Sequence, residues 1–277
     1  MVDPFVTWAW CRDNVDSLTF ADVRWHLDKK GYEGYASGHI PGAVFLDLDK
    51  DLAGHGAPTD GRHPLPTPEH FARALSKVGI DGSKPVIAYD SEGGIFAARL
   101  VWMLRTLGLE AAVLDGGLAD VDVELETGWP THEPAHFAPR PWPGDAIVST
   151  QQVLAAAKDD ATILIDARPT SRFEGDDDVD ARAGHIPSAA SVPCRDHVSE
   201  SGHLKDDDEL RSTFARAGIT AESQAPVVSY CGSGVTGCHN ILVMEHLGLG
   251  TPKLYPGSFS AWAADERLPV EVGPGRR

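Results

Sequence analysis

The chain contains the same pattern twice. The tetrapeptide Gly-His-Ile-Pro occurs at 38–41 and again at 184–187. Downstream of each copy an apolar run leads into a glycine-rich stretch, with Asp90 at the junction in the first copy and Cys231 in the second. A third pair of similar segments follows in the same order, at 113–121 and 254–262. Three matching segments in one order indicate a duplicated domain, and their wide spacing excludes a solenoid, whose repeats are about 20–50 residues long.

A proline-rich segment, 127–145, lies between the two copies and has neither helical nor strand periodicity. Such a composition is typical of an extended linker. The length of 277 residues is also near the size at which one hydrophobic core divides into two. We therefore expect one domain over 1–126, a linker over 127–145 and a second domain over 146–277.

Each copy alternates short apolar runs with helical stretches, which predicts a mostly parallel sheet flanked by helices. In the second copy we expect strands at 161–168, 189–193, 226–230 and 252–256, and helices at 149–160, 206–218 and 237–248. The strands are nearly continuous apolar runs, as expected when both faces of a sheet are covered. The fold class is therefore α/β, with two tandem domains. Ligands of such folds bind beyond the carboxyl ends of the strands, and Cys231 is the first residue past one of those ends.

The composition excludes several classes of protein. A net charge of −17 argues against binding to nucleic acid or to an anionic membrane, since phosphate contacts need clustered Lys and Arg. No apolar run is long enough to span a bilayer, and the N-terminal residues do not resemble a signal peptide. Four irregularly placed cysteines do not form a disulfide framework. We therefore expect a cytoplasmic protein.

The loop after Cys231 predicts a reactive thiol. Gly232, Gly234 and Gly237 allow the backbone to curl with its N–H groups pointing inward, and a helix is expected to begin there. Such a nest is an anion site, and the first anion that it can stabilise is the thiolate of Cys231. The other cysteines are expected to be structural; they are Cys11, Cys194 and Cys238.

Two other chemistries of cysteine are excluded by the spacing. A cysteine phosphatase has an arginine six positions after the nucleophile, where this chain has Gly237. A thioredoxin-type dithiol needs Cys-x-x-Cys, which does not occur here. What remains is a lone activated thiolate, which suits attack on a soft centre such as sulfur. No metal or organic cofactor is implied.

The sequence resembles the two-domain rhodanese-type sulfurtransferases over almost its whole length. The second copy carries the motifs "DARPTSRFEG", "GHIPSA", "CGSGVTGCHN" and "YPGSFSAW" of the catalytic domain, and the first copy carries "SGHIPGA" and "LDGGL" of the non-catalytic one. In this family thiosulfate sulfurtransferases usually have a cationic loop, Cys-Arg-Lys-Gly-Val-Thr. The neutral loop of this chain is more similar to that of 3-mercaptopyruvate sulfurtransferases.

The resemblance implies that an arginine binds the carboxylate of the donor, and bidentate arginine suits that group. Arg172 matches the family's arginine in the "RF" motif, and Arg182 is a second candidate. Either could instead be a surface arginine paired with the acidic run 176–180. The loop itself would bind substrate through its backbone, at Gly232, Gly234, Val235 and Thr236.

The resemblance also implies a proton relay in which Asp49 and His63, from the first copy, work with Ser233. His39 and His185, in the repeated tetrapeptides, are expected to be structural, because both copies have them and only one has the thiol. Asp90 is expected to do no chemistry, since a carboxylate is too hard a nucleophile for sulfur.

These features predict an enzyme that moves sulfur from 3-mercaptopyruvate to Cys231 as a persulfide and releases pyruvate. A thiol, a thioredoxin-like protein or cyanide then accepts the sulfur. Two alternatives remain open from the sequence. The donor could be thiosulfate, or the chain could be a persulfide carrier that passes sulfur to a partner without turning over a small donor.

Overall fold

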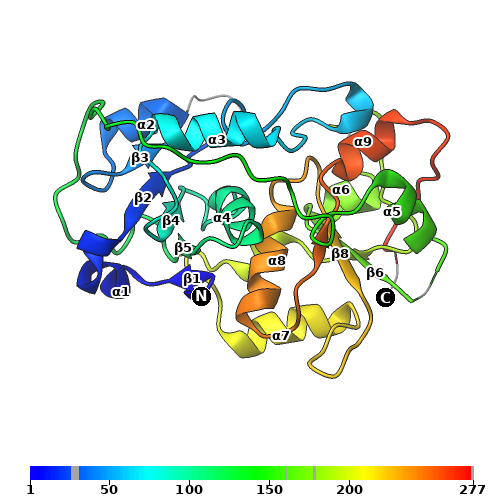
Figure 1. Ribbon diagram of the computed structural model, residues 1–277. Coiled ribbons are helices and arrows are strands. Elements are labelled where there is room, and N and C mark those ends of the chain that lie inside the picture. The colour runs from blue at the N-terminus through cyan, green and yellow to red at the C-terminus, as the bar shows by residue number, and fades with distance from the viewer. Residues whose placement is uncertain (26–30, 160, 177–178, 276–277) are drawn as a thin grey trace. The chain divides into compact units, whose positions relative to one another are not determined.

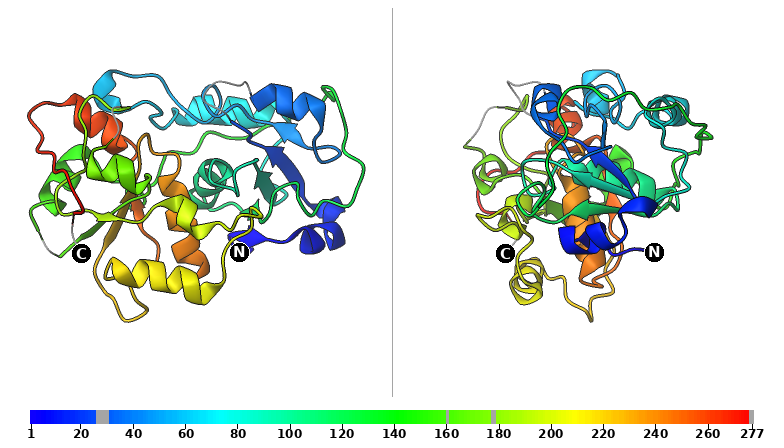
Figure 2. Two further views of the ribbon diagram at one scale, coloured as in Figure 1. Left: turned by 180° about the vertical axis from the view of Figure 1, so that it is seen from behind. Right: turned by 90° about the vertical axis from the view of Figure 1, so that its left-hand side faces the viewer.

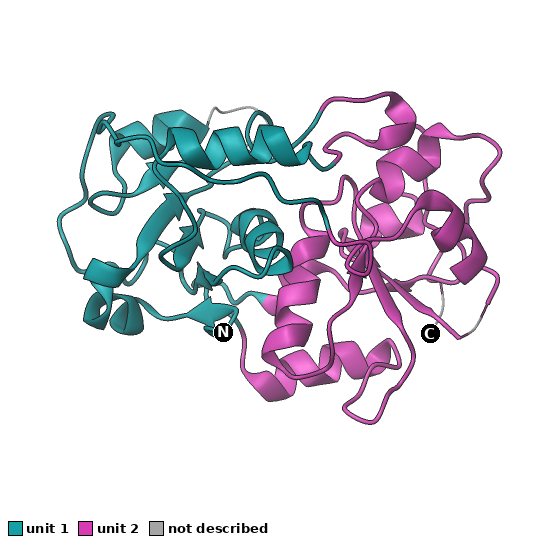
Figure 3. Cartoon of the chain, in the orientation of Figure 1, with its two compact units in different colours: residues 1–54, 65–142, 198–204 teal, residues 55–64, 143–197, 205–277 magenta. Residues whose placement is uncertain are grey.

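The computed structural model describes residues 1–25, 31–159, 161–176 and 179–275, so residue 160 of one predicted helix and 177–178 of the acidic run lie outside the described residues. The chain divides into two compact units (Figure 3). Unit 1 comprises 1–54, 65–142 and 198–204, and unit 2 comprises 55–64, 143–197 and 205–277. Each unit therefore contains a short segment from the other half of the sequence.

Unit 1 is built on a parallel sheet with the strand order β1-β5-β4-β2-β3 (Figure 1). Its strands are β1 (Phe5–Val6), β2 (Thr19–Asp22), β3 (Val44–Phe45), β4 (Val86–Tyr89) and β5 (Ala111–Leu114). Its helices are α1 (Trp8–Asp13), α2 (Gly31–Ser37), α3 (Pro68–Lys77) and α4 (Ala97–Thr106), with a 3₁₀ turn η1 (Val15–Ser17). The α4 helix packs against β4 and β5 (Figure 2). The β4 strand is buried along its whole length.

Unit 2 has a parallel sheet with the order β7-β6-β8-β9. Its strands are β6 (Ile163–Asp166), β7 (Ala190–Ser191), β8 (Val227–Tyr230) and β9 (Lys253–Leu254). Its helices are α5 (Thr150–Ala156), α6 (Thr170–Glu174), α7 (Asp207–Arg216), α8 (Gly237–His246) and α9 (Ser258–Ala264), with 3₁₀ turns η2 (Pro58–Asp60) and η3 (Cys194–His197). Each of the four predicted strands is confirmed, though shorter. The three predicted helices are confirmed too, while α6 and α9 were not predicted.

The two sheets have the same topology. The order β5-β4-β2-β3 in unit 1 corresponds to β9-β8-β6-β7 in unit 2. The place of β1 is taken in unit 2 by a single parallel bridge between Ile147 and Leu254. The α/β fold class and its duplication are therefore confirmed. In the part of the chain that the structure describes, no helix is both long and apolar enough to cross a bilayer.

The same two side-chain contacts stabilise both units. Arg24 binds the Asp22 carboxylate and the carbonyl of Gly38, and Arg168 makes the same pair of contacts with Asp166 and Gly184. These four side chains belong to a further match, "ADVR" with "IDAR", which the sequence comparison overlooked. Arg168 is therefore a structural residue.

The repeated histidines pack alike, as expected of structural residues. His39 stacks on the ring of Tyr35 at 3.8 Å between ring centroids, and His185 stacks on Phe173 at 3.7 Å. The Nδ1 atom of each also lies 2.8 Å from the carbonyl oxygen of the residue on which the ring stacks. Both histidines are completely buried.

The Asp90 side chain occupies the centre of the glycine-rich loop of unit 1 and binds the backbone N–H groups of that loop. Its carboxylate accepts hydrogen bonds from the backbone N–H groups of Glu92, Gly94, Phe96 and Ala97, at 2.7–2.8 Å. Burial raises the pKa of Asp90, while these four N–H donors act to lower it. A loop of this kind at the end of β4 is thus an anion-binding nest, and in unit 1 the anion belongs to the protein itself.

We expect Asp90→Ala to destabilise the protein by about 2–4 kcal/mol, because a buried N–H left without a partner costs about 1–3 kcal/mol. Denaturant unfolding of the whole chain measures this loss. Asp13→Ala, at an exposed position in unit 1, is the control and should change the free energy of unfolding by less than about 0.5 kcal/mol. Equal stability of the two variants would contradict the role of Asp90.

Candidate active site

Cys231 lies at the carboxyl end of β8, where the strand passes into the glycine-rich loop. Its backbone is held by α9: the N–H of Cys231 donates to Ser258 Oγ at 3.1 Å, and its carbonyl accepts from the N–H of Phe259 at 2.9 Å. The N–H of Gly234 donates to Cys231 Sγ at 3.1 Å. The sulfur therefore occupies in unit 2 the same place in the nest as the carboxylate of Asp90 in unit 1, and it accepts a backbone N–H there.

The loop keeps its shape because its glycines meet other atoms closely. Gly234 has a φ of +79°, and a Cβ there would lie 2.4 Å from the carbonyl oxygen of Pro256. At Gly232 a Cβ would lie 2.8 Å from Arg62 Nη2 and 3.3 Å from Arg172 Nη2. No side chain could be added at either position without displacing its neighbours. Of the predicted loop residues, Gly234 contacts the sulfur through its N–H, Val235 is buried, and Thr236 stands just before α8.

The other three cysteines are buried and have structural surroundings. Burial raises the pKa of Cys11, in unit 1, to about 12. Burial also raises the pKa of Cys194 to about 12, with a smaller contribution from Cys231, and Cys194 hydrogen-bonds the side chain of Thr236. The thiol of Cys238 donates to the carbonyl of Gly234 at 3.5 Å.

A segment from the first half of the sequence completes this site within unit 2. It runs from 55 to 64 and packs its turn η2 against α9. The N–H of Arg62 donates to Ser260 Oγ at 3.1 Å, and Gly61, at a φ of +93°, approaches Gly257 so closely that a Cβ would lie 2.6 Å from the Gly257 carbonyl oxygen. The segment is therefore held against α9 by contacts immediately before His63.

His63, carried by this segment, lies beside the loop that follows Cys231. Its Nδ1 atom is 2.8 Å from Ser233 Oγ, a hydrogen-bond distance. The pair His63 and Ser233, predicted to work together, is thus brought together. Asp49 belongs to unit 1, where its carboxylate accepts a hydrogen bond from Trp25 Nε1 at 2.9 Å.

Three arginines surround one carboxylate next to the loop. Arg172, on α6, donates from Nη2 to Asp180 at 2.7 Å. Arg62 forms a short ion pair with the same carboxylate, and Arg168 Nη1 lies 3.5 Å from it. The Asp180 side chain is only 3% exposed. Arg172 therefore does pair with the acidic run, because Asp180 belongs to that run. The same guanidinium group also borders the loop, since its Nη2 atom would lie 3.3 Å from a Cβ on Gly232.

Arg62 was missed by sequence reasoning, although it stands next to the predicted His63. The signal that could have found it is its position in the segment "DGRHPLP", since any fold that brings His63 to Ser233 also brings its neighbour.

Arg182 is not a carboxylate-binding residue. Its guanidinium donates to four backbone carbonyl groups at and beyond the end of α9, at 2.8–3.0 Å; they belong to Trp262, Ala263, Asp265 and Leu268. It therefore caps α9 and stabilises the chain that follows, as cations do at a helix carboxyl end. Sequence reasoning misplaced it because the segment from Arg172 to His185 allows several alignments of a second arginine.

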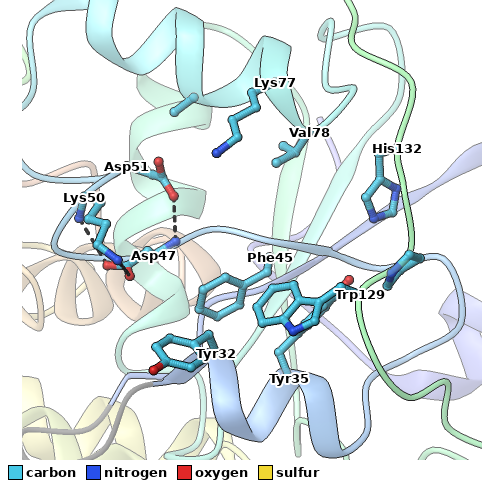
Figure 4. A pocket seen from close by; sticks show the side chains of 12 residues that line it. Tyr32, Tyr35, Phe45, Asp47, Lys50, Asp51, Lys77, Val78, Trp129 and His132 are labelled. Carbon is cyan, nitrogen blue, oxygen red and sulfur yellow. Dashed lines mark hydrogen bonds and ion pairs between the residues drawn. The ribbon is translucent and has the colours of Figure 1, made fainter.

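A separate pocket of about 400 Å³ lies in unit 1 and offers no comparable chemistry (Figure 4). Aromatic side chains line one side, among them Phe45 and Trp129, which contact each other edge to face. On the other side Lys50 pairs with Asp47 at 3.2 Å, and Asp51 accepts from the Asp47 N–H. Among the described residues no group of three His, Cys, Asp or Glu side chains is arranged to hold a metal ion.

We expect iodoacetamide at neutral pH to alkylate Cys231 about tenfold or more faster than the other three cysteines. All four are at most 4% exposed, so exposure does not separate them. Burial raises the pKa of Cys11 and Cys194 to about 12, and the Cys238 thiol donates to the Gly234 carbonyl, whereas the Cys231 sulfur accepts the Gly234 N–H. Peptide mapping by mass spectrometry identifies the site, with a Cys231→Ser variant as the control for background labelling. Faster labelling of Cys11, Cys194 or Cys238 would contradict the account of the nest.

Comparison with known proteins agrees with this geometry. The chain matches the Rhodanese-like domain family over residues 7–123 and 149–265. It is 38% identical to the 3-mercaptopyruvate sulfurtransferase of Escherichia coli (strain K12), over 96% of this chain and 97% of that protein. It is 30% identical to Thiosulfate/3-mercaptopyruvate sulfurtransferase 1, mitochondrial, of Arabidopsis thaliana, over 97% of this chain and 78% of that one.

The solved structure of 3-mercaptopyruvate sulfurtransferase from Leishmania major is similar to this chain, with a TM-score of 0.86 and 31% identity over 97% of this chain and 76% of that one. The resemblance inferred from the sequence motifs is thereby confirmed. The chain belongs to the rhodanese-like family and consists of two rhodanese-like domains, of which the second carries the cysteine.

Proposed function

We propose that this protein transfers sulfur from 3-mercaptopyruvate to an acceptor through a persulfide on Cys231. Its family and its relatives named 3-mercaptopyruvate sulfurtransferase establish a sulfurtransferase. The observation that carries the choice of donor is a loop without charged side chains, whose N–H at Gly234 meets Cys231 Sγ, bordered by arginines that suit a carboxylate.

In the first half-reaction the Cys231 thiolate attacks the sulfur of the donor. A sulfur–sulfur bond forms, the carbon–sulfur bond breaks, and its electron pair leaves with the three-carbon fragment as the enolate of pyruvate. Arg172 binds the carboxylate of the donor during this step, and the loop N–H groups of 232–236 stabilise the charge on sulfur. Because these N–H groups are already in position, they do not have to reorient when negative charge develops in the transition state.

The enolate becomes pyruvate when its carbon gains a proton. His63 and Ser233, hydrogen-bonded at 2.8 Å, supply that proton. Asp49 as a third member of the relay remains a prediction from the family resemblance.

In the second half-reaction the nucleophilic sulfur of an acceptor attacks the outer sulfur of the persulfide, and Cys231 leaves as the thiolate. A thiol, a thioredoxin-like protein or, in an assay, cyanide is the proposed acceptor. We place the reaction in the cytoplasm, and we retain 1–126 and 146–277 as the proposed domains on either side of the linker 127–145. No step requires a metal or an organic cofactor.

Thiosulfate is the second candidate donor. It is supported by the Arabidopsis relative, whose name includes both donors, and by the arginines beside Gly232. Steady-state kinetics with both donors and cyanide as acceptor decide between them. If kcat/KM is higher for thiosulfate, thiosulfate is the principal donor in place of 3-mercaptopyruvate. If a persulfide forms on Cys231 but neither donor is turned over, the protein is a persulfide carrier.

We expect Arg172→Ala to lower kcat/KM for 3-mercaptopyruvate about 10- to 150-fold, because a hydrogen bond to a charged group contributes about 1.5–3 kcal/mol. The side chain donates to Asp180 in the free protein, so unfolding of the variant is measured alongside the kinetics. Arg211→Ala, on α7 and paired only at the surface with Asp207, is the control. An unchanged kcat/KM in a folded Arg172 variant would exclude the carboxylate role.

Gly61→Ala should lower kcat/KM about 10- to 100-fold, since the added Cβ pushes the segment 55–64 away from Gly257 and displaces His63 from Ser233. Gly218→Ala is a matched control, because its φ of +78° imposes the same backbone strain and a Cβ there meets nothing within 4 Å. Kinetics and unfolding of both variants separate a local effect on the site from strain alone. The prediction fails if the two variants lose activity equally.

A further inference from the structure

Two serines of α9 carry hydroxyl groups that the matching residues of unit 1 lack. In the third pair of similar segments Ser258 matches Gly117, and Ser260 matches Ala119. Both serines are buried, and each hydroxyl group accepts a backbone N–H and donates to a backbone carbonyl. The two side chains therefore act on the backbone around them, and only in the copy that carries the nucleophile.

Ser258 adopts a backbone conformation that favours glycine. Its φ is +52°, close to the +56° of Gly117, and a residue with a Cβ persists in this region only where its surroundings compensate the strain. The compensating contacts come from its hydroxyl group, which accepts the N–H of Cys231 at 3.1 Å and donates to the carbonyl of Tyr255 at 2.9 Å. The strained residue thus holds the peptide group of the nucleophile.

Ser260 links the two segments that carry the proposed proton donors. Its N–H donates to the carbonyl of Gly232 at 2.9 Å, and its Oγ accepts the N–H of Arg62 at 3.1 Å. Ser233 directly follows the first of these residues, and His63 follows the second. The hydrogen bond of 2.8 Å between Ser233 and His63 closes a ring of contacts through Ser260, which therefore fixes how this pair meets.

We propose that Ser258 and Ser260 are positioning residues of the sulfur-transfer reaction. Ser258 fixes the direction in which the Cys231 sulfur attacks the donor, and Ser260 fixes His63 against Ser233 for proton transfer. Such control matters because a displacement of about 1 Å can lower a rate about a hundredfold. The proposal rests on the proposed function above and adds two residues that act through others.

Substitution of Ser258 separates orientation from stability. Ser258→Ala keeps the strain and loses the hydroxyl group, whereas Ser258→Gly also relieves the strain, so we expect the glycine variant to resist denaturant better than the alanine variant. Both should lower the maximum rate of persulfide formation on Cys231 about tenfold and change the donor concentration at half-maximal rate by less than about twofold. A wild-type rate in the glycine variant would leave Ser258 with a structural role only.

A double-mutant cycle tests whether Ser260 acts through His63. Ser260→Ala removes the acceptor of the Arg62 N–H and should lower the rate of pyruvate formation about tenfold. In a His63→Ala background the same substitution should lower the rate by less than about twofold, because the group that it positions is gone. Ser258→Gly should keep its full effect in that background. Equal effects of Ser260→Ala in both backgrounds would overturn its positioning role.

Ser223→Ala is the matched control for both serines. The Oγ of Ser223 also accepts a backbone N–H, from Thr220 at 2.9 Å, and donates to a backbone carbonyl, that of Gly218 at 3.0 Å. It lies before β8, at the end of the strand opposite to Cys231. This variant should change neither the rate of persulfide formation nor the rate of pyruvate formation.

NMR signals report both contacts without any sulfur donor. Ser258→Gly should shift the amide signal of Gly234, whose N–H donates to Cys231 Sγ, and Ser260→Ala should shift the ring signals of His63. If both shifts appear and neither donor is turned over by the unmodified protein, the proposed donors are wrong and the positioning roles stand. If turnover is normal in every serine variant, the sulfurtransferase function stands and the positioning roles are wrong.

Discussion

Backbone N–H groups that converge on an anion at the end of a parallel strand are the interaction on which both halves of this protein depend. In unit 1 the anion is Asp90, whose carboxylate takes four N–H donors and closes the loop. In unit 2 the side chain at the same place is Cys231, which takes the N–H of Gly234. A carboxylate that accepts four N–H groups stabilises the loop, whereas a sulfur that accepts one such group remains available to react.

The site also needs polar side chains from other segments of the chain, because the loop after Cys231 contains no charged residue. The segment 55–64 provides Arg62 and His63, and α6 provides Arg172. These groups can act on a small substrate only if the backbone that carries them is rigid. The close approach of Gly61 to Gly257 and the bond from Arg62 N–H to Ser260 give that rigidity.

Much of the fold was predictable from the sequence because short local patterns of apolar residues and glycines determine its strands and loops. The apolar runs around Ile165 and Val228 predicted buried parallel strands, and the glycines around Cys231 predicted the nest. Long-range contacts of polar side chains were not predictable in the same way. Arg182 and Arg62 are both arginines near a recognisable motif, and only the folded chain shows that one caps α9 while the other borders Gly232. His63 was predicted because the family resemblance implied a role for it; the packing of its segment on α9 could not be predicted, since that segment has no periodic pattern of apolar residues.

The exchange of segments between the two units limits how the duplication can be taken apart. Residues 55–64 are encoded in the first half and stand in the second unit, and 198–204 do the reverse. A fragment that begins at the linker would contain the nucleophile and its nest, yet it would lack the residue that meets Ser233 and one of the cations beside Gly232. A fusion or permutation of this chain that is meant to preserve the site should therefore keep residues 55–64 connected to unit 2.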